Sequence, residues 1–428
     1  MALDIDLLGS SSSYADVKEK LIHQYIRQVV AHEMGHTLGL RHNFTASTAR
    51  TPAELADPIV SETRGLTASV MDYMPPNIFA LKHPGVDFFS RMPGEYDHFA
   101  IHYGYMDVPA DTPKGELPTL QQWAARGGQL GLRFQTDQMT DSWDPDVFMF
   151  DLSNDPLAWM QKTADVSRYL LQTVGQRKPA HGESYYEFTR AFLYLLNQYI
   201  TAGTSTERFI GGVKISANYK GDSHEMPVYE PVDGATQRRA LHMLDTLLFS
   251  PSAFEFPKSY YTELTPDPNA HGTQTGSGQR LFPVYSVYSK AQAAALDNLF
   301  SPDRLTRIVN NEYRVSDPSQ ELSLAGLFSD VGGSLWSELE RNKPVNALRR
   351  QLQREYLSIL LKNVVTRPTG MPEEAIALSY NQLRWLKGET QKAANHTSDE
   401  YTRVHLLECN ARINQALNAV VTRTDKFE

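Results

Sequence analysis

Three histidines at short intervals constrain the fold of this chain more than any other feature of its sequence. His32 and His36 are four residues apart, and His42 follows after five intervening residues. Residues four apart on an α-helix project from the same face, so these two imidazoles can reach one metal ion. Gly39 lies where that helix has to end, because glycine readily takes the positive φ that turns the chain back toward His42. The spacing therefore predicts a long helix that ends in a three-histidine site for one Zn²⁺ per chain.

Glu33 follows the first of these histidines and completes the pattern HExxHxxGxxH over residues 32–42. Three protein ligands leave a fourth zinc position open for water, whose pKa the metal lowers. A carboxylate at this place can accept the proton of that water, so Glu33 is the candidate general base for attack on a carbonyl group. A histidine-rich helix end without a function is the alternative, and the five fixed positions together argue against it.

A second segment, Ser69-Val70-Met71-Asp72-Tyr73, lies downstream of these histidines. Together with residues 32–42 it resembles the metzincin clan of zinc metallopeptidases, in which a methionine-containing turn forms an apolar floor beneath the histidines. The resemblance implies this structural role for Met71, for which an ordinary core methionine is the alternative. It also implies that Tyr73 lies near the metal, either as an outer ligand or as a donor to the developing oxyanion.

Further segments narrow the resemblance to a family of large bacterial zinc-dependent met-zincins. These are HEMGHTLGLRHNF at 32–44, DLSNDP at 151–156 and FIGGV at 209–213, while residues 95–105 resemble the C-terminal helix of the clan. The resemblance covers about residues 15–215. Because members of that family are secreted or periplasmic, it implies such a location here, although we find no signal peptide in the chain as given.

The metzincin resemblance also implies a partner. In that clan an N-terminal sheet precedes the zinc helix, and its edge strand pairs with an extended substrate, whereas 31 residues precede His32 in this sequence. We therefore expect the chain to act with an N-terminal portion of the same longer protease. The expected substrate is a protein or a peptide.

Hydrophobic periodicity predicts a mainly α fold, or α+β if the missing sheet is included. Apolar residues recur three and four apart between Val17 and Val30, which indicates the helix that carries the zinc site. We expect residues 1–109 to form the zinc-binding, metzincin-like catalytic portion. Residues 110–156, rich in Asp, Gly and Pro, should form an irregular linker or surface excursion, and residues 157–428 a mostly helical C-terminal region.

Composition excludes several other classes of function. The formal net charge is −9 and no basic stripe is present, so nucleic acid is not an expected partner. No apolar run approaches the roughly 20 residues that a membrane-spanning helix needs. The single cysteine, Cys409, excludes an intrachain disulfide, and we interpret it as a small buried residue.

An acidic run is the remaining candidate for a metal site. Its oxygens could bind a structural Ca²⁺, but the spacing does not match an EF-hand, and a solvated acidic loop with helix-capping aspartates is the favoured interpretation. We therefore leave it out of the predicted metal sites. The run consists of Asp137, Asp141, Asp144, Asp146, Asp151 and Asp155.

These observations predict a zinc-dependent endopeptidase, or the zinc-bearing part of one. The alternatives are a truncated, noncatalytic module that holds zinc or binds a protein, and a zinc hydrolase that acts on substrates other than peptides. A structural zinc site normally closes with four protein ligands, whereas no fourth ligand is evident and Glu33 occupies the position of a base.

Overall fold

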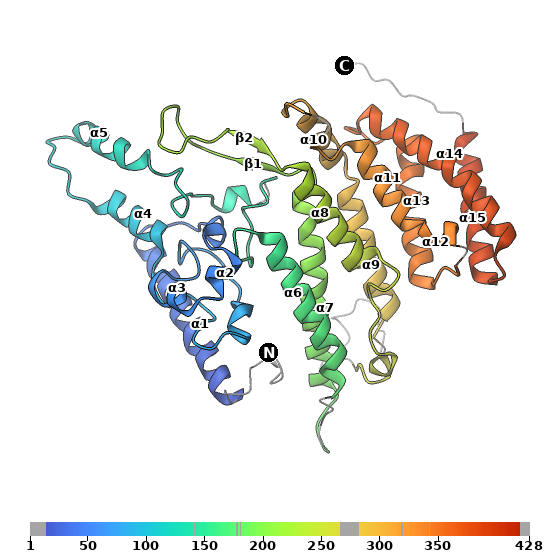
Figure 1. Ribbon diagram of the computed structural model, residues 1–428, viewed down its shortest axis with the longest axis horizontal. Helices are drawn as coiled ribbons and strands as arrows, with labels where there is room; N and C mark the ends of the chain where they lie inside the picture. The colour runs from blue at the N-terminus through green and yellow to red at the C-terminus, as the bar shows by residue number, and fades with distance from the viewer. Residues whose placement is uncertain are drawn as a thin grey trace. The chain divides into compact units, whose positions relative to one another are not determined.

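A computed structural model shows a mainly α-helical protein (Figure 1), which confirms the predicted fold class. It describes residues 14–140, 143–176, 179, 181–265, 282–317, 320–341 and 343–419. The chain forms two compact units. The first consists of residues 1–166 and 212–230, and the second of residues 167–211 and 231–428.

The first unit combines a long N-terminal helix with short helices and extended loops. Helix α5 lies within the segment 110–156, which the sequence indicated to be irregular. A two-stranded sheet of β1 and β2 is the sheet found among the described residues. The elements are α1 (Tyr14–Thr37), η2 (Ala46–Ala49), α2 (Pro52–Leu55), α3 (Pro58–Thr63), η3 (Ile78–Leu81), α4 (Glu95–Tyr105), α5 (Pro113–Ala124), η4 (Asp137–Met139), β1 (Val213–Ile215) and β2 (Tyr229–Pro231).

Buried polar side chains help to hold helix α1 to the rest of this unit. Gln24 is buried, and its amide oxygen accepts a hydrogen bond of 2.7 Å from the backbone of Phe88. One helical turn later, the amide of Gln28 donates to the carbonyl of Val70 over 3.2 Å. These bonds hold one face of α1 against the loops around Phe88 and Val70. The same face of the helix continues to His32.

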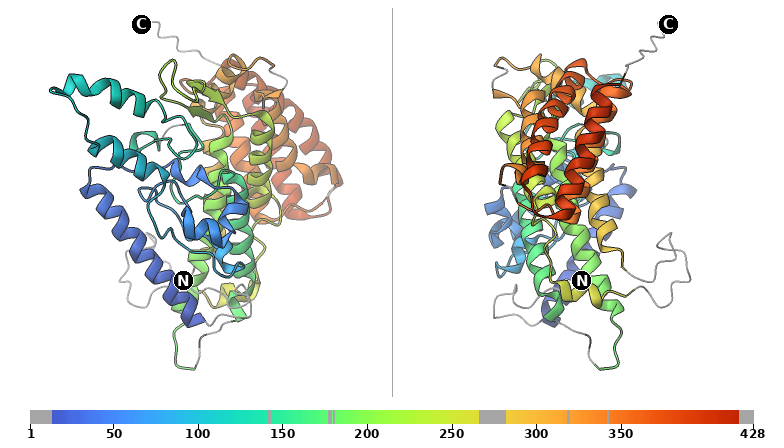
Figure 2. Two further views of the ribbon diagram at one scale, coloured as in Figure 1. Left: turned by 60° about the vertical axis from the view of Figure 1, so that its left-hand side comes forward. Right: turned by 90° about the vertical axis from the view of Figure 1, so that its right-hand side faces the viewer.

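Helices make up nearly all of the second unit. Helix α6 (Pro156–Thr173) begins in the first unit and continues into the second. Both views in Figure 2 show α14 and α15 side by side, and each of them also packs against α13. The remaining elements are η5 (Val174–Gln176), α7 (Tyr186–Ser205), η6 (Thr206–Phe209), α8 (Gly234–Leu244), the π-helical η7 (Asp245–Phe249), η8 (Lys258–Thr262), α9 (Val284–Leu299), α10 (Pro302–Glu312), α11 (Leu324–Leu335), α12 (Ser337–Arg341), α13 (Ala347–Val365), α14 (Glu373–His396) and α15 (Glu400–Leu417).

The core of the second unit encloses both apolar and charged side chains. Cys409 is fully buried, as the sequence indicated. The Arg349 guanidinium, also buried, donates to Glu338 over 2.7 Å, so the charge of each side chain is compensated inside the core. Among the helices of the described residues, none combines the length and the apolarity needed to cross a membrane.

Candidate metal centre

The C-terminal end of α1 turns the chain back on itself at Gly39. This residue has a φ of 83°, in the left-handed region that favours glycine. Across the turn, the amide of Leu40 donates to the carbonyl of Gly35 over 3.0 Å, the long-range bond typical of a glycine-terminated helix. The following residues therefore run back alongside the last turn of the helix, which returns His42 to the helical histidines.

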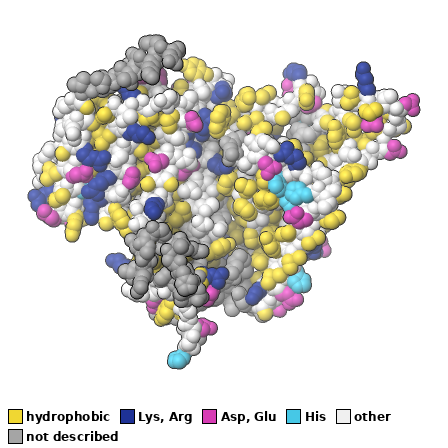
Figure 3. Space-filling model, turned by 180° about the vertical axis from the view of Figure 1, so that it is seen from behind, with side chains coloured by type: hydrophobic (Ala, Val, Ile, Leu, Met, Phe, Trp, Pro, Cys, Tyr) yellow, Lys and Arg dark blue, Asp and Glu magenta, His cyan; other side chains and the backbone are white. Residues whose placement is uncertain are grey.

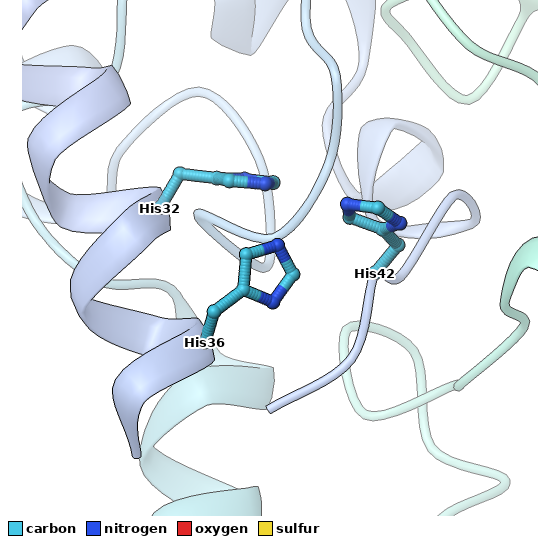
Figure 4. A group of neighbouring side chains, drawn as sticks. All are labelled: His32, His36 and His42. Atoms are coloured by element: carbon cyan, nitrogen blue, oxygen red, sulfur yellow. The ribbon is translucent and has the colours of Figure 1, made fainter. Parts of the chain in front are cut away.

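His32, His36 and His42 meet at one point of the first unit. A ring nitrogen from each lies within 4.8 Å of one from each of the others. Figure 4 shows the first two projecting from α1 and the third entering from the chain beyond the turn. His32 is buried, whereas His36 is exposed, so the cluster lies at the surface of the unit with one of its three imidazoles in the core.

Hydrogen bonds fix the orientation of all three rings. The Nδ1 atom of His32 lies 2.8 Å from the carbonyl oxygen of Val70, and that of His36 lies 3.0 Å from the carbonyl oxygen of Leu40. A carbonyl accepts only, so Nδ1 carries the proton in both rings and the lone pair lies on Nε2. The Nδ1 atom of His42 lies 2.7 Å from a carboxylate oxygen of Asp137. Three oriented imidazoles of this tautomer form a donor set that fits Zn²⁺.

Burial favours the neutral ligand form in the most enclosed of these rings. It lowers the pKa of His32, and the hydrogen bond to Val70 partly opposes that shift. The hydrogen bond from His42 lowers the pKa of the partner carboxyl, Asp137, to about 2. The site therefore combines an uncharged imidazole with a carboxylate that stays ionised at neutral pH.

Tyr73 lies beside the histidines. Its hydroxyl is 2.9 Å from Nε2 of His42, and burial raises its pKa, with contributions from the charges of Asp137 and Glu33. Since Nδ1 of His42 is occupied by the carboxylate, the hydroxyl donates and Nε2 accepts. The phenol thus lies at the nitrogen that would face a metal ion.

Met71 packs directly under the last turns of α1. It is fully buried, and a Cβ atom added to Gly35 would lie 2.3 Å from its Sδ atom. A side chain at residue 35 would therefore displace the methionine. Glycine at this point of the helix permits the close approach.

Helix α4 holds the segment Ser69–Tyr73 in place. The carboxylate of Asp97 accepts hydrogen bonds from the hydroxyl of Ser69 at 2.5 Å and from the backbone of Val70 at 2.8 Å. Val70 in turn accepts the Nδ1 hydrogen of His32. This chain of contacts links α4 to the most buried histidine.

Two residues that support this site were absent from the sequence-based prediction. Asp137 belongs to the acidic run that we had set aside, and it is 95 residues from His42 in the chain. Asp97 belongs to the predicted helix at residues 95–105, but no role at the site was predicted for its side chain. The structure brings together all of the predicted residues: His32, Glu33, His36, Gly39, His42, Met71 and Tyr73.

Comparison with known proteins identifies the family of this chain. No curated protein and no solved structure matches the chain at a significant level. The model of the protein family described as Met-zincin matches residues 15–343, which is most of the chain and includes the three histidines. The resemblance indicated by the sequence is thereby confirmed, and the chain belongs to the Met-zincin family, a family of metzincin-type zinc metallopeptidases.

Proposed function

We propose that this protein is a zinc-dependent endopeptidase that holds one Zn²⁺ per chain through His32, His36 and His42. The observation that supports it most strongly is the convergence of three imidazoles whose Nδ1 atoms are all engaged, which directs the remaining nitrogens to a common point. Metal analysis and cleavage of an unstructured protein such as casein test the proposal. We expect about one zinc per chain and cleavage that a chelator abolishes.

Glu33 is the proposed general base. It lies on the last turns of α1, one residue from His32, with an exposed side chain whose charge acts on both His32 and Tyr73. Bound zinc would lower the pKa of a water molecule at its open position. Glu33 would take the proton of that water, and the Tyr73 hydroxyl would donate to the oxyanion that develops on the substrate carbonyl.

Asp137 is the proposed positioning residue for the third ligand. Its carboxylate orients the His42 ring, and outer partners of this kind typically change metal affinity by about 10- to 100-fold. We predict that Asp137→Ala weakens zinc binding by about that factor. Asp137→Asn should weaken it less, because an amide oxygen still accepts the Nδ1 hydrogen. Zinc titration against a competing chelator measures both.

A control isolates the effect of the contact from that of the charge. Asp107 is an exposed acidic residue with no described contact to the histidines, so Asp107→Asn should bind zinc as the parent does. Equal zinc affinity of the parent and Asp137→Ala would remove Asp137 from the site.

The outer face of α1 is unusually apolar for a surface. Tyr25, Ile26, Val30 and Met34 are each more than half exposed, and Figure 3 shows a band of hydrophobic side chains over this side of the first unit. Contiguous apolar patches of this kind mark interaction surfaces. The helix thus presents Ile26, Val30 and Met34 at the surface, whereas Val17 is buried and the Tyr25 ring also contacts Phe89.

We propose that a strand-rich N-terminal segment of the same protease covers this face and supplies the strand that pairs with a peptide substrate. A groove of about 740 Å³ in the first unit lies between α4, α5 and the β1–β2 hairpin, and none of the three histidines lines it. The exposed apolar face, in contrast, extends along α1 to the residues next to the site.

Chemical labelling can test this arrangement, because the only native cysteine, Cys409, is fully buried. A thiol reagent should label Val30→Cys rapidly in the 428-residue chain. Labelling should be much slower in a polypeptide that also carries the upstream region of the gene. Glu116→Cys on α5 should react equally in both. Equal reactivity of the position-30 thiol in the two polypeptides would contradict the proposed covering.

We also propose that the protein acts in the periplasm or outside the cell, as the family resemblance implies. Cell fractionation followed by detection of the native protein tests this location. Recovery from the cytoplasm alone would contradict it.

A further inference from the structure

The segment of residues 147–154 is hydrogen-bonded to two parts of the chain that form the metal centre. The amide of Phe148 donates to the carbonyl of Phe44 over 3.3 Å, just beyond the third histidine of the cluster. The amide of Phe150 donates to the carbonyl of Tyr73 over 2.9 Å. These two bonds hold the segment beside the tyrosine of the site.

Within this segment, Phe150 has a backbone conformation that is rare for a bulky residue. Its φ is 64°, in the left-handed region that favours glycine. Val147 and Leu152, on either side of it, are both 0% exposed, so the surrounding core fixes the path of the chain. A residue other than glycine persists in this conformation only where the structure around it enforces it, and such residues gather at functional sites.

This conformation places an aromatic ring at the surface next to Tyr73. Phe150 is 64% exposed, and its ring is stacked on that of Tyr73 with the centroids 6.0 Å apart and an angle of 24° between the planes. The Tyr73 ring in turn lies 4.7 Å from the ring of His42, whose Nε2 atom its hydroxyl contacts. An apolar surface therefore faces solvent beside the tyrosine of the metal centre.

The stability of the fold does not explain a phenylalanine at this position. A ring that stays mostly in water gains little from burial, and glycine would adopt the same φ without a steric cost. Contact with a ligand explains both the ring and its exposure. The charged groups that raise the pKa of Tyr73 are the carboxylates of Asp137 and Glu33, so an acidic ligand group would be repelled here.

We propose that Phe150 and the ring of Tyr73 form a subsite for a large apolar side chain of the substrate, preferably an aromatic one. Adjacent aromatic rings attract each other beyond the effect of buried area alone. One extended residue spans about 3.3 to 3.6 Å, so a ring this close to Tyr73 and His42 lies within about three residues of a peptide bond at the metal. The inference rests on the proposed endopeptidase function and names its substrate class.

Peptide hydroxamates can test the subsite apart from catalysis, because a hydroxamate binds zinc without turnover. Two series of peptides extend from the hydroxamate in the two chain directions and carry Phe or Ala at each of the three nearest positions. Calorimetric titration of the full, zinc-loaded chain measures their affinities. At one position we expect the Phe ligand to bind the parent about tenfold more tightly than the Ala ligand.

The variant Phe150→Gly should reduce this preference by roughly 2- to 10-fold and bind the Ala ligand as the parent does. Its midpoint of thermal unfolding should stay the same or rise, because glycine adopts the positive φ without strain, whereas loss of a structural side chain would lower the midpoint. The control Tyr313→Ala removes another aromatic side chain, 87% exposed, for which the structure describes no ring contact. It should keep the parental preference.

Three results would overturn the subsite. These are a parent that binds no hydroxamate, a parent that binds the Phe and Ala ligands equally at every position, and a Phe150→Gly variant with the parental preference. Failure of the endopeptidase proposal gives a different result. A zinc-loaded parent that prefers the Phe ligand through Phe150 but cleaves no peptide has the subsite without the catalytic activity.

Discussion

We expect the replacement of His36 with alanine to abolish stoichiometric zinc binding and to leave the fold intact. His36 is exposed, and the only described hydrogen bond of its side chain goes to the carbonyl of Leu40, at the end of the same helix. Its removal therefore creates no cavity in the core. Two remaining imidazoles hold zinc much more weakly than three, because each ligand contributes directly to the affinity. Metal analysis after dialysis against zinc-free buffer measures the loss, and circular dichroism checks the fold.

The same helix offers a matched control. His23 is also an exposed histidine on α1, three turns before the site, where its side chain is 74% exposed. We expect His23→Ala to retain its zinc. Stoichiometric zinc in His36→Ala would show that the ion binds elsewhere, and the three-histidine assignment would fail.

The ligand cluster could be predicted from sequence because its geometry is local. Helical periodicity places His32 and His36 on one face, and Gly39 has the positive φ that its position in the motif indicated. The apolar spacing between Val17 and Val30 likewise identified a helix. It could not show which partner the apolar side meets. In the structure Val17 is buried and the Tyr25 ring contacts Phe89, whereas Ile26 and Val30 are exposed.

Contacts between segments that lie far apart in the chain could not be predicted from the sequence. Nothing in the spacing of the acidic run marks Asp137 as the partner of His42. Nothing in the sequence around Asp97 marks that residue as the hydrogen-bond partner of Val70. The helix α5 was also missed, although Thr112 caps it and Pro113 occupies its first position, because we interpreted the proline and glycine as loop residues.

The interpretation of the acidic run as a solvated loop was wrong for two of its members. Asp144 and Asp151 are buried, and burial raises the pKa of Asp144 to about 6, even though backbone amides donate to it. Asp155 does cap a helix, since its carboxylate accepts from the amide of Ala158. Asp141 lies outside the described residues. Composition identifies a polar segment, but only tertiary packing decides which of its carboxylates meet the core.

Replacing Glu33 with glutamine separates zinc binding from catalysis. The exposed side chain of Glu33 contributes no ligand in the proposed site, so Glu33→Gln should keep about one zinc per chain. Glutamine has nearly the same shape but cannot accept the proton of the attacking water. Because general base action typically contributes about 10² to 10⁴ in rate, we expect chelator-sensitive casein cleavage to fall by at least about a hundredfold.

The design of this measurement has to allow for the uncovered face of α1. If the strand that aligns a peptide comes from an upstream segment, cleavage by the 428-residue chain should be much weaker than cleavage by a polypeptide that carries that segment, so both are assayed. Glu19→Gln, which removes another exposed carboxylate of α1, should cleave as the parent does. If Glu33→Gln matches the parent, or if the zinc-loaded longer polypeptide cleaves nothing in a broad peptide library, the site serves zinc binding alone and the protein is a noncatalytic module.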